Sequence, residues 1–242
     1  MTLVAIHARA MTRELVRYPA YVVPTVLFPT AFFLFFVAPA PGPYATIRMA
    51  AFAGFAAIGV AFFQFGVGIA VDRASPWEAY LRTLPVTVGE RLVARVVSAA
   101  GFAVAAAASV VVTALLTTDA TLDARRWAYL ALALLLGTVP FALLGIALGY
   151  WAPQRGALPI ANLLYLGLSY AGGLWIRPSE LPHAVRAISP YLPTRALADL
   201  LRNVVYRDAL TPRPWLALGA FSVIFAGLAV AGYRRDEGKR YR

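Results

Sequence analysis

Six apolar runs without a charged side chain constrain this chain of 242 residues more than any other feature. An α-helix rises about 1.5 Å per residue, so about 20 apolar residues cross a hydrocarbon core of about 30 Å. The loops between the runs are too short for a separate globular domain of about 100 residues. We therefore predict an all-α integral membrane protein with a single transmembrane domain over residues 1–242. Its six predicted transmembrane helices lie at 20–37, 49–71, 96–116, 128–151, 156–176 and 215–233.

The composition points the same way. Hydrophobic residues make up 61% of the chain and charged residues 14%, which excludes an ordinary soluble domain. Lysine and arginine outnumber aspartate and glutamate by 22 to 11, a net charge of +11. In a soluble protein this excess would suggest nucleic acid as a partner. Here the basic residues flank the apolar runs, so we expect anionic lipid headgroups as the counter-charge and no nucleic-acid partner.

The first run has an alternative interpretation as a cleaved signal peptide, because residues 38–40 resemble a small-residue cleavage site. The hydrophobic region of a signal peptide usually spans about 7–15 residues, and this run is longer. We therefore favour a retained helix, kinked at Pro24 and Pro29.

The distribution of lysine and arginine predicts the orientation, because cytoplasmic loops carry an excess of these residues. Thirteen of them fall in the N-terminal arm, the loop 72–95, the turn at Arg155 and the tail 234–242. We therefore predict that both termini are cytoplasmic. The segment 177–213 carries six arginines although this orientation places it outside, and we interpret it as a folded element that is translocated despite its charge.

The polar residues favour a passive membrane body. Catalysis or proton pumping inside a bilayer normally requires an ionisable side chain at membrane depth, and the six runs contain none. His7 and His183 are predicted on opposite sides of the membrane, and the single lysine, Lys239, lies outside any phosphate-binding loop. With no cysteine either, we predict no catalytic residue, no metal site, no cofactor bound by this chain and no enzyme activity.

The arm at residues 1–18 places Arg9, Arg13 and Arg17 on one stripe of a helix. This spacing predicts an amphipathic elbow helix that lies on the cytoplasmic membrane surface. A loosely ordered basic arm is the alternative.

The loop 72–95 contains a second helix signal. Ser75 is a candidate cap, Pro76 suits the first helical position and Glu78 has the spacing of a capping box, with a stop before Pro85. The resulting cytoplasmic helix would present Trp77, Tyr80, Leu81 and Leu84 for docking onto a partner protein. An interfacial loop with aromatic anchors is the alternative.

Prolines interrupt the first part of the segment 177–213. The pattern of its second part predicts a helix that starts at Thr194. Apolar residues recur there with helical spacing, so the helix is amphipathic and lies at the outer interface or dips into it. The apolar positions are Leu197, Leu200, Leu201, Val204 and Val205, with Arg195, Asp199 and Arg202 on other faces.

Gly145 and Gly149 form a small-xxx-small pattern, which lets two helix backbones approach closely. We favour packing within one subunit over dimerisation for this pair, and ordinary packing for Gly167, Gly172 and Gly173.

Two stretches of the chain resemble a known protein family. The stretches DRASPWEAYLRTLPVTVGERLVAR (72–95) and GGLWIRPSELPHAVRAISPYLPTRALADLLRNVV (172–205), with six spans and an elbow helix, look like the permease subunit of type-2 ATP-binding-cassette (ABC) transporters, especially bacterial drug and natural-product exporters. The resemblance covers nearly the whole chain. At 176–178 the sequence Ile-Arg-Pro departs from the more usual aromatic-apolar-proline.

The resemblance implies a homodimer in the bacterial cell membrane that pairs with two copies of a separate ABC ATPase, which binds ATP and Mg²⁺. It implies export of a hydrophobic or amphipathic small molecule, such as a drug, an antibiotic or a lipid-like compound, and hence efflux and antibiotic resistance. The segment 177–213 would be an extracellular helical hairpin. The segment 72–95 would contain the coupling helix that contacts the ATPase, and this role falls on Trp77, Glu78, Tyr80, Leu81, Arg82 and Pro85.

An apolar cargo needs adaptable aromatic area with few polar anchors. On that ground the candidates for lining a substrate pathway are Phe28, Phe32, Phe62, Phe63, Gln64 and Tyr165. Import instead of export stays open. The alternative function is a secondary transporter or channel that needs no ATP, which the lack of intramembrane acids and of inverted-repeat signs disfavours.

Overall fold

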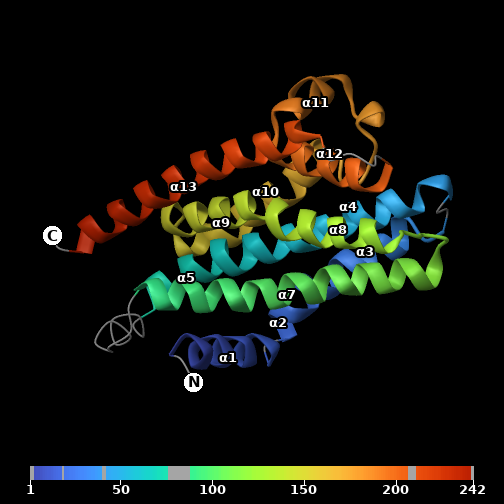
Figure 1. Cartoon of the computed structure of the whole chain (residues 1–242). Coiled ribbons are helices and arrows are strands. Elements are labelled where there is room, and N and C mark those ends of the chain that lie inside the picture. The colour runs from blue at the N-terminus through green and yellow to red at the C-terminus, as the bar shows by residue number, and fades with distance from the viewer. Residues whose placement is uncertain (1–2, 18, 40–41, 76–87, 207–210, 241–242) are drawn as a thin grey trace.

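The computed structural model describes residues 3–17, 19–39, 42–75, 88–206 and 211–240, and within these ranges every regular element is a helix. The helices form an elongated bundle (Figure 1). One end of the bundle gathers the end of α5, the start of α7, the α9–α10 turn and the end of α13; we call it the terminal end. The other end carries α11 and α12 and is called the hairpin end. Three of the predicted basic segments, the loop 72–95 through its described flanks, the turn at Arg155 and the end of α13, therefore share one end. The segment 177–213 with its six arginines lies at the other end.

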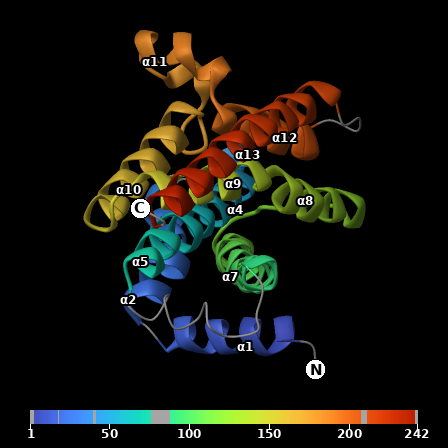
Figure 2. The same ribbon diagram turned by 90° about the vertical axis from the view of Figure 1, so that its left-hand side faces the viewer.

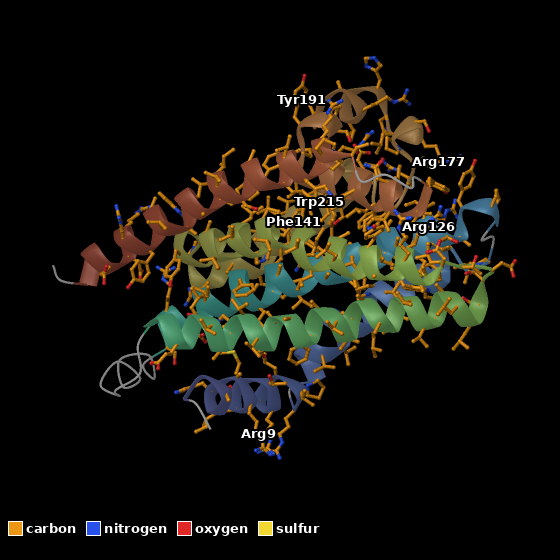
Figure 3. The ribbon with its side chains drawn as sticks, viewed as in Figure 1. Arg9, Arg126, Phe141, Arg177, Tyr191 and Trp215 are labelled. Carbon is orange, nitrogen blue, oxygen red and sulfur yellow. The ribbon has the colours of Figure 1, made fainter. Side chains whose placement is uncertain are left out.

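Helix α1, Leu3–Val16, corresponds to the predicted elbow helix. It crosses beside α7 outside the main bundle, and Arg9 points away from the other helices (Figures 2 and 3). Arg13 and Arg17 are exposed too, whereas Ala8 is buried and the Thr12 hydroxyl donates a hydrogen bond to Ser98 Oγ of α7 at 3.1 Å. The basic stripe and the packed face therefore lie on different sides of the helix.

The first predicted span forms a helix that changes its winding at the expected place. It begins as α2, Pro19–Val22, continues as the π-helix η1, Val23–Leu27, and ends as α3, Phe28–Phe36. Each proline lacks a backbone N–H, so the regular hydrogen-bond pattern is interrupted at Pro24 and Pro29. A short 3-10 turn, η2 at Gly42–Tyr44, leads into the second span.

The second span is the centre of the bundle. It comprises α4, Ala45–Val60, the π-helix η3, Ala61–Val67, and α5, Gly68–Ala74. Nearly every side chain from Met49 to Phe62 is buried. A helix that is apolar on all faces can be covered on all faces at no polar cost. Helix α7, Val88–Thr117, packs against α4.

The fourth predicted span is divided at Thr138 into α8, Ala124–Gly137, and α9, Val139–Trp151. The side chain of Asp123 caps α8 by accepting the Arg126 N–H at 2.8 Å. Helix α10, Gln154–Ala171, follows after a two-residue connection, as the tight turn in the sequence predicted. Helix α13, Pro212–Arg240, packs along α9.

Between α10 and α13 lie the short helices η4 (Pro178–Glu180), α11 (His183–Ile188) and η5 (Ser189–Tyr191), followed by α12, Pro193–Tyr206. Helix α12 is more deeply packed than an interfacial helix would be, because it lies against α4, α8, α10 and α13. Gly54 and Gly137 make room for it: a Cβ atom there would lie 2.9 Å from Leu201 Cδ1 and 2.7 Å from Leu197 Cδ1.

Four helices of the described chain are long and apolar enough to cross a membrane: Gly42–Ala74, Leu92–Thr117, Ala124–Trp151 and Pro212–Glu237. The other two predicted spans correspond to the shorter apolar helix Thr25–Phe36 and to the 18-residue α10, so the count of six stays a prediction. The outer faces of α7 and α13 carry large exposed apolar side chains such as Leu116 and Val223. Such faces suit contact with lipid.

Candidate functional site

The residues predicted to contact an ATPase, Trp77, Glu78, Tyr80, Leu81, Arg82 and Pro85, lie outside the described residues. Their flanks are described: α5 ends at Ala74 and α7 begins at Val88, both at the terminal end (Figure 1). Ser75 has an extended backbone, with φ −79° and ψ 134°, which is the conformation that an N-cap residue adopts.

Asp72 connects the end of α5 to α7. Its carboxylate forms an ion pair with Arg95, whose Nη1 also donates to the Gln64 carbonyl at 3.0 Å. Gly68 leaves space for this guanidinium, because a Cβ there would lie 2.8 Å from Arg95 Nη1. One arginine of α7 thus holds both η3 and α5.

The next residue, Arg73, connects α5 to the other side of the bundle. Its Nη2 pairs with Asp236 of α13, and its Nη1 donates to the Gly149 carbonyl of α9 at 2.6 Å. The guanidinium also lies over the Tyr150 ring, 5.5 Å from its centroid. These side chains are mostly shielded, with 23% of Arg73 and 12% of Asp236 exposed.

A second cation–π contact reinforces this junction. Arg235 lies 4.9 Å from the Trp151 ring centroid, and the Trp151 indole N–H donates to the Leu228 carbonyl at 3.0 Å. Beside these groups the structure has a small cavity of about 190 Å³, lined by Arg73, Tyr150, Trp151, Ala152, Pro153, Arg235 and Asp236.

The polar junction is therefore the set Asp72, Arg73, Arg95, Tyr150, Trp151, Arg235 and Asp236. The adjacent residues Asp72 and Arg73 lie at its centre. Asp72 contacts α7, and Arg73 contacts α13 on the other side. These ion pairs connect the end of α5 to both helices. The sequence reasoning did not find this site. Its signals were an opposite-charge dipeptide directly after an apolar run and an aspartate within a basic tail.

Five of the six predicted pathway residues belong to one aromatic cluster. Tyr165 of α10 stacks on Phe55 of α4, with centroids 4.4 Å apart and planes at 2°. Edge contacts link Phe55 to Trp175 at 5.3 Å and Phe32 to Trp175 at 5.2 Å. The aromatic cluster comprises Phe28, Phe32, Phe52, Phe55, Phe62, Phe63, Tyr165 and Trp175. Sequence reasoning missed Phe52, Phe55 and Trp175, because nothing local marks which aromatics meet.

Exposure differs within this cluster. Phe62 and Tyr165 are buried, and Gln64 is buried beside the polar junction, where its carbonyl meets Arg95. Phe28 is 39% exposed, and Phe32 and Phe63 are half-buried. The cluster thus runs from the core to the surface of the chain. The indole N–H of Trp175 is buried and donates no hydrogen bond within the described chain.

Tyr165 offers a direct test of this packing. Its hydroxyl donates to the Phe55 carbonyl at 3.2 Å, and its ring is buried. We expect Tyr165→Phe to lower the free energy of unfolding by about 1 kcal/mol. We expect Tyr165→Ala to lower it by about 3–5 kcal/mol through loss of the ring. Unfolding in mixed detergent micelles measures both, and equal losses would contradict a packing role for the ring.

The fold and the polar junction together define the class: a polytopic α-helical membrane protein in which ion pairs tie the end of α5 to α7 and α13. Its described residues hold no cluster suited to a metal. The chain belongs to the ABC-2 type transporter family, whose model matches residues 2–206. It is therefore a membrane subunit of an ABC transporter, with a transport role instead of an enzymatic one.

A curated relative agrees with this assignment. The chain is 23% identical over 234 residues to "Putative transport permease YvfS" of Bacillus subtilis (strain 168), covering 94% of this chain and 96% of the relative. No solved structure matches the chain.

Proposed function

We propose that the chain forms a homodimer, pairs through the segment 72–95 with two copies of a separate ABC ATPase, and exports a hydrophobic or amphipathic small molecule across a bacterial cell membrane. Membership of the ABC-2 family implies an ATPase partner. The observation that carries the coupling role is the polar junction, because it links the base of segment 76–87 to α7 and α13.

The polar junction supports this proposal mechanically. The Arg73–Asp236 pair is mostly shielded, and such a pair resists separation more than an exposed pair does. Force applied by an ATPase to residues 76–87 would therefore move α5, α7 and α13 together instead of fraying the end of α5. In this proposal both termini and the terminal end face the cytoplasm, and the basic side chains there contact anionic headgroups.

The aromatic cluster supports the cargo class. Large flat side chains adapt to apolar compounds, and a pathway for apolar cargo needs few polar anchors. In this proposal the exposed ring of Phe28 and the half-buried rings of Phe32 and Phe63 form the surface of the pathway. Phe62 and Tyr165 support these rings from the core.

The test of the ATPase role uses Trp77→Asp. We expect this charge in an aromatic docking surface to reduce copurification of a candidate ATPase at least about tenfold, in keeping with the energetic weight of aromatic anchors in interfaces. The helical content and unfolding midpoint of the permease should stay unchanged. Tyr191→Asp is the control, since it adds the same charge at the hairpin end, where Tyr191 is 79% exposed (Figure 3).

Copurification that is unchanged by Trp77→Asp would contradict the docking role. The alternative function, a carrier or channel that needs no ATP, makes the opposite prediction in vesicles. If the permease alone moved a compound against its gradient, the ATPase-dependent proposal would fail.

A further inference from the structure

A charged groove lies at the hairpin end, far from the polar junction. It has a volume of about 680 Å³ and is formed by α12 and the first turns of α13, which pack side by side. Pockets of roughly 300–1,000 Å³ accommodate small ligands. The groove therefore has room for the head of an amphiphile.

Positive charge dominates the groove. Among the described residues, its charged lining consists of Arg195, Arg202 and Arg213 and one carboxylate, Asp199. Asp199 accepts from Arg195 Nε at 2.9 Å and from Arg202 Nη1 at 2.6 Å, so it serves two cations at once. In this described lining, three guanidinium groups against one carboxylate leave two positive charges. Burial lowers the pKa of Arg202, and the neighbouring Asp199 offsets this effect only in part.

The arginines also retain unused donors. Arg195 uses its Nε for Asp199, and neither of its terminal nitrogens donates to another described residue. Arg213 makes no hydrogen bond or ion pair within the described ranges. A guanidinium binds phosphate or carboxylate through two parallel N–H groups. The unused N–H groups of Arg195 and Arg213 face one groove and together form a binding surface for an anion.

The groove continues into an apolar surface. Ala217 belongs to its lining, and Phe221, Ile224 and Leu228 follow at four, seven and eleven residues, which keeps them on the same side of α13. Ile224 and Leu228 are 56% and 45% exposed. A ligand whose anionic head occupied the groove would find a path for an acyl chain along α13.

We propose that the α12–α13 groove binds the anionic headgroup of a membrane amphiphile, with Arg195 and Arg213 holding the phosphate and α13 contacting the tail. This site is independent of the aromatic cluster and of any ATPase. It would let the hairpin end respond to the charge of the surrounding lipid.

The test titrates the purified full-length permease in neutral detergent with three probes: dihexanoyl phosphatidylglycerol, dihexanoyl phosphatidylcholine and inorganic phosphate. Both lipids carry a phosphate, but the choline cation of phosphatidylcholine is repelled by the positively charged groove. Calorimetry should therefore give half-saturation by the anionic lipid at a concentration about tenfold below that of the zwitterionic lipid, a difference of about 1.4 kcal/mol. Inorganic phosphate, which lacks a tail, should bind more weakly than phosphatidylglycerol.

The variants locate the site. Arg213→Gln, an exposed change that leaves the Asp199 contacts intact, should weaken phosphatidylglycerol binding, and the double variant Arg195→Gln, Arg213→Gln should remove the preference over phosphatidylcholine. Arg177→Gln is the matched control, because Arg177 lies at the same end but pairs with Glu180 outside the groove (Figure 3). Unfolding midpoints verify that each variant is folded.

Any of three binding results would overturn this proposal: equal binding of both lipids, a preference that survives in the double variant, or inorganic phosphate that binds as tightly as phosphatidylglycerol. A groove sealed by a second copy of the chain would also overturn it, and a cross-link between cysteines placed at residue 213 of two copies would reveal that arrangement.

Discussion

Replacing Gly145 and Gly149 together with alanine is expected to disrupt the bundle. A Cβ at Gly145 would lie 2.6 Å from the Ala61 carbonyl oxygen, and a Cβ at Gly149 would lie 2.8 Å from that of Phe65. Both obstacles are backbone atoms of η3, so they move only if α9 and η3 separate. Overpacking typically costs about 1–3 kcal/mol per site, and we expect a loss of about 2–6 kcal/mol for the pair.

Reversible unfolding in mixed detergent micelles, followed by circular dichroism, measures this loss. Gly167→Ala and Gly227→Ala are matched controls, because a Cβ at either position meets no atom within 4 Å. Alanine also has the higher helix propensity, so the controls should be neutral or slightly stabilising. A double variant as stable as the controls would show that α9 does not pack closely on η3. The contacts already place this glycine pair inside one subunit, as the sequence reasoning favoured.

Breaking the Arg73–Asp236 pair is expected to uncouple transport. Arg73→Ala removes a cation from an aspartate that is 12% exposed and a donor from the Gly149 carbonyl. Loss of one partner of a buried pair costs about 3–5 kcal/mol, and partial exposure reduces our expectation to about 1–3 kcal/mol. We expect ATP-dependent transport in reconstituted vesicles to fall at least about tenfold, the factor that corresponds to about 1.4 kcal/mol, because α13 no longer follows α5.

A double-mutant cycle with Asp236→Ala isolates the pair energy. The exchange Arg73→Asp with Asp236→Arg should restore part of the transport, because it restores the pair but not the bond to Gly149. Arg177→Ala serves as the control, since its pair with Glu180 has side chains 51% and 44% exposed. Such exposed pairs contribute about 0–1 kcal/mol. Equal transport by Arg73→Ala and Arg177→Ala would rule out the coupling role of the junction.

The sequence was informative wherever local chemistry is decisive. A long apolar run without charges is energetically acceptable only in the hydrocarbon core of a membrane. The length of the run determines whether its helix can cross that core. The altered winding around Pro24 and Pro29 followed from the missing N–H of proline, and the helix after Pro193 followed from apolar spacing. That the flanks of loop 72–95, the turn at Arg155 and the end of α13 lie at one end of the bundle followed from their order along the chain.

What the sequence alone determined is thus the helical membrane architecture and its family motifs, because these depend on neighbours within about 20 residues. Only the tertiary structure decided which distant residues meet. Arg73 pairs with Asp236 across a separation of 163 residues, and Tyr165 bonds to Phe55 across 110 residues. The amphipathic helix α12 is buried, although its sequence suggested a place at the membrane interface. Helix packing selects among many apolar faces of nearly equal hydrophobicity, and the choice rests on close fit at glycines such as Gly54 and Gly137, which no local pattern encodes.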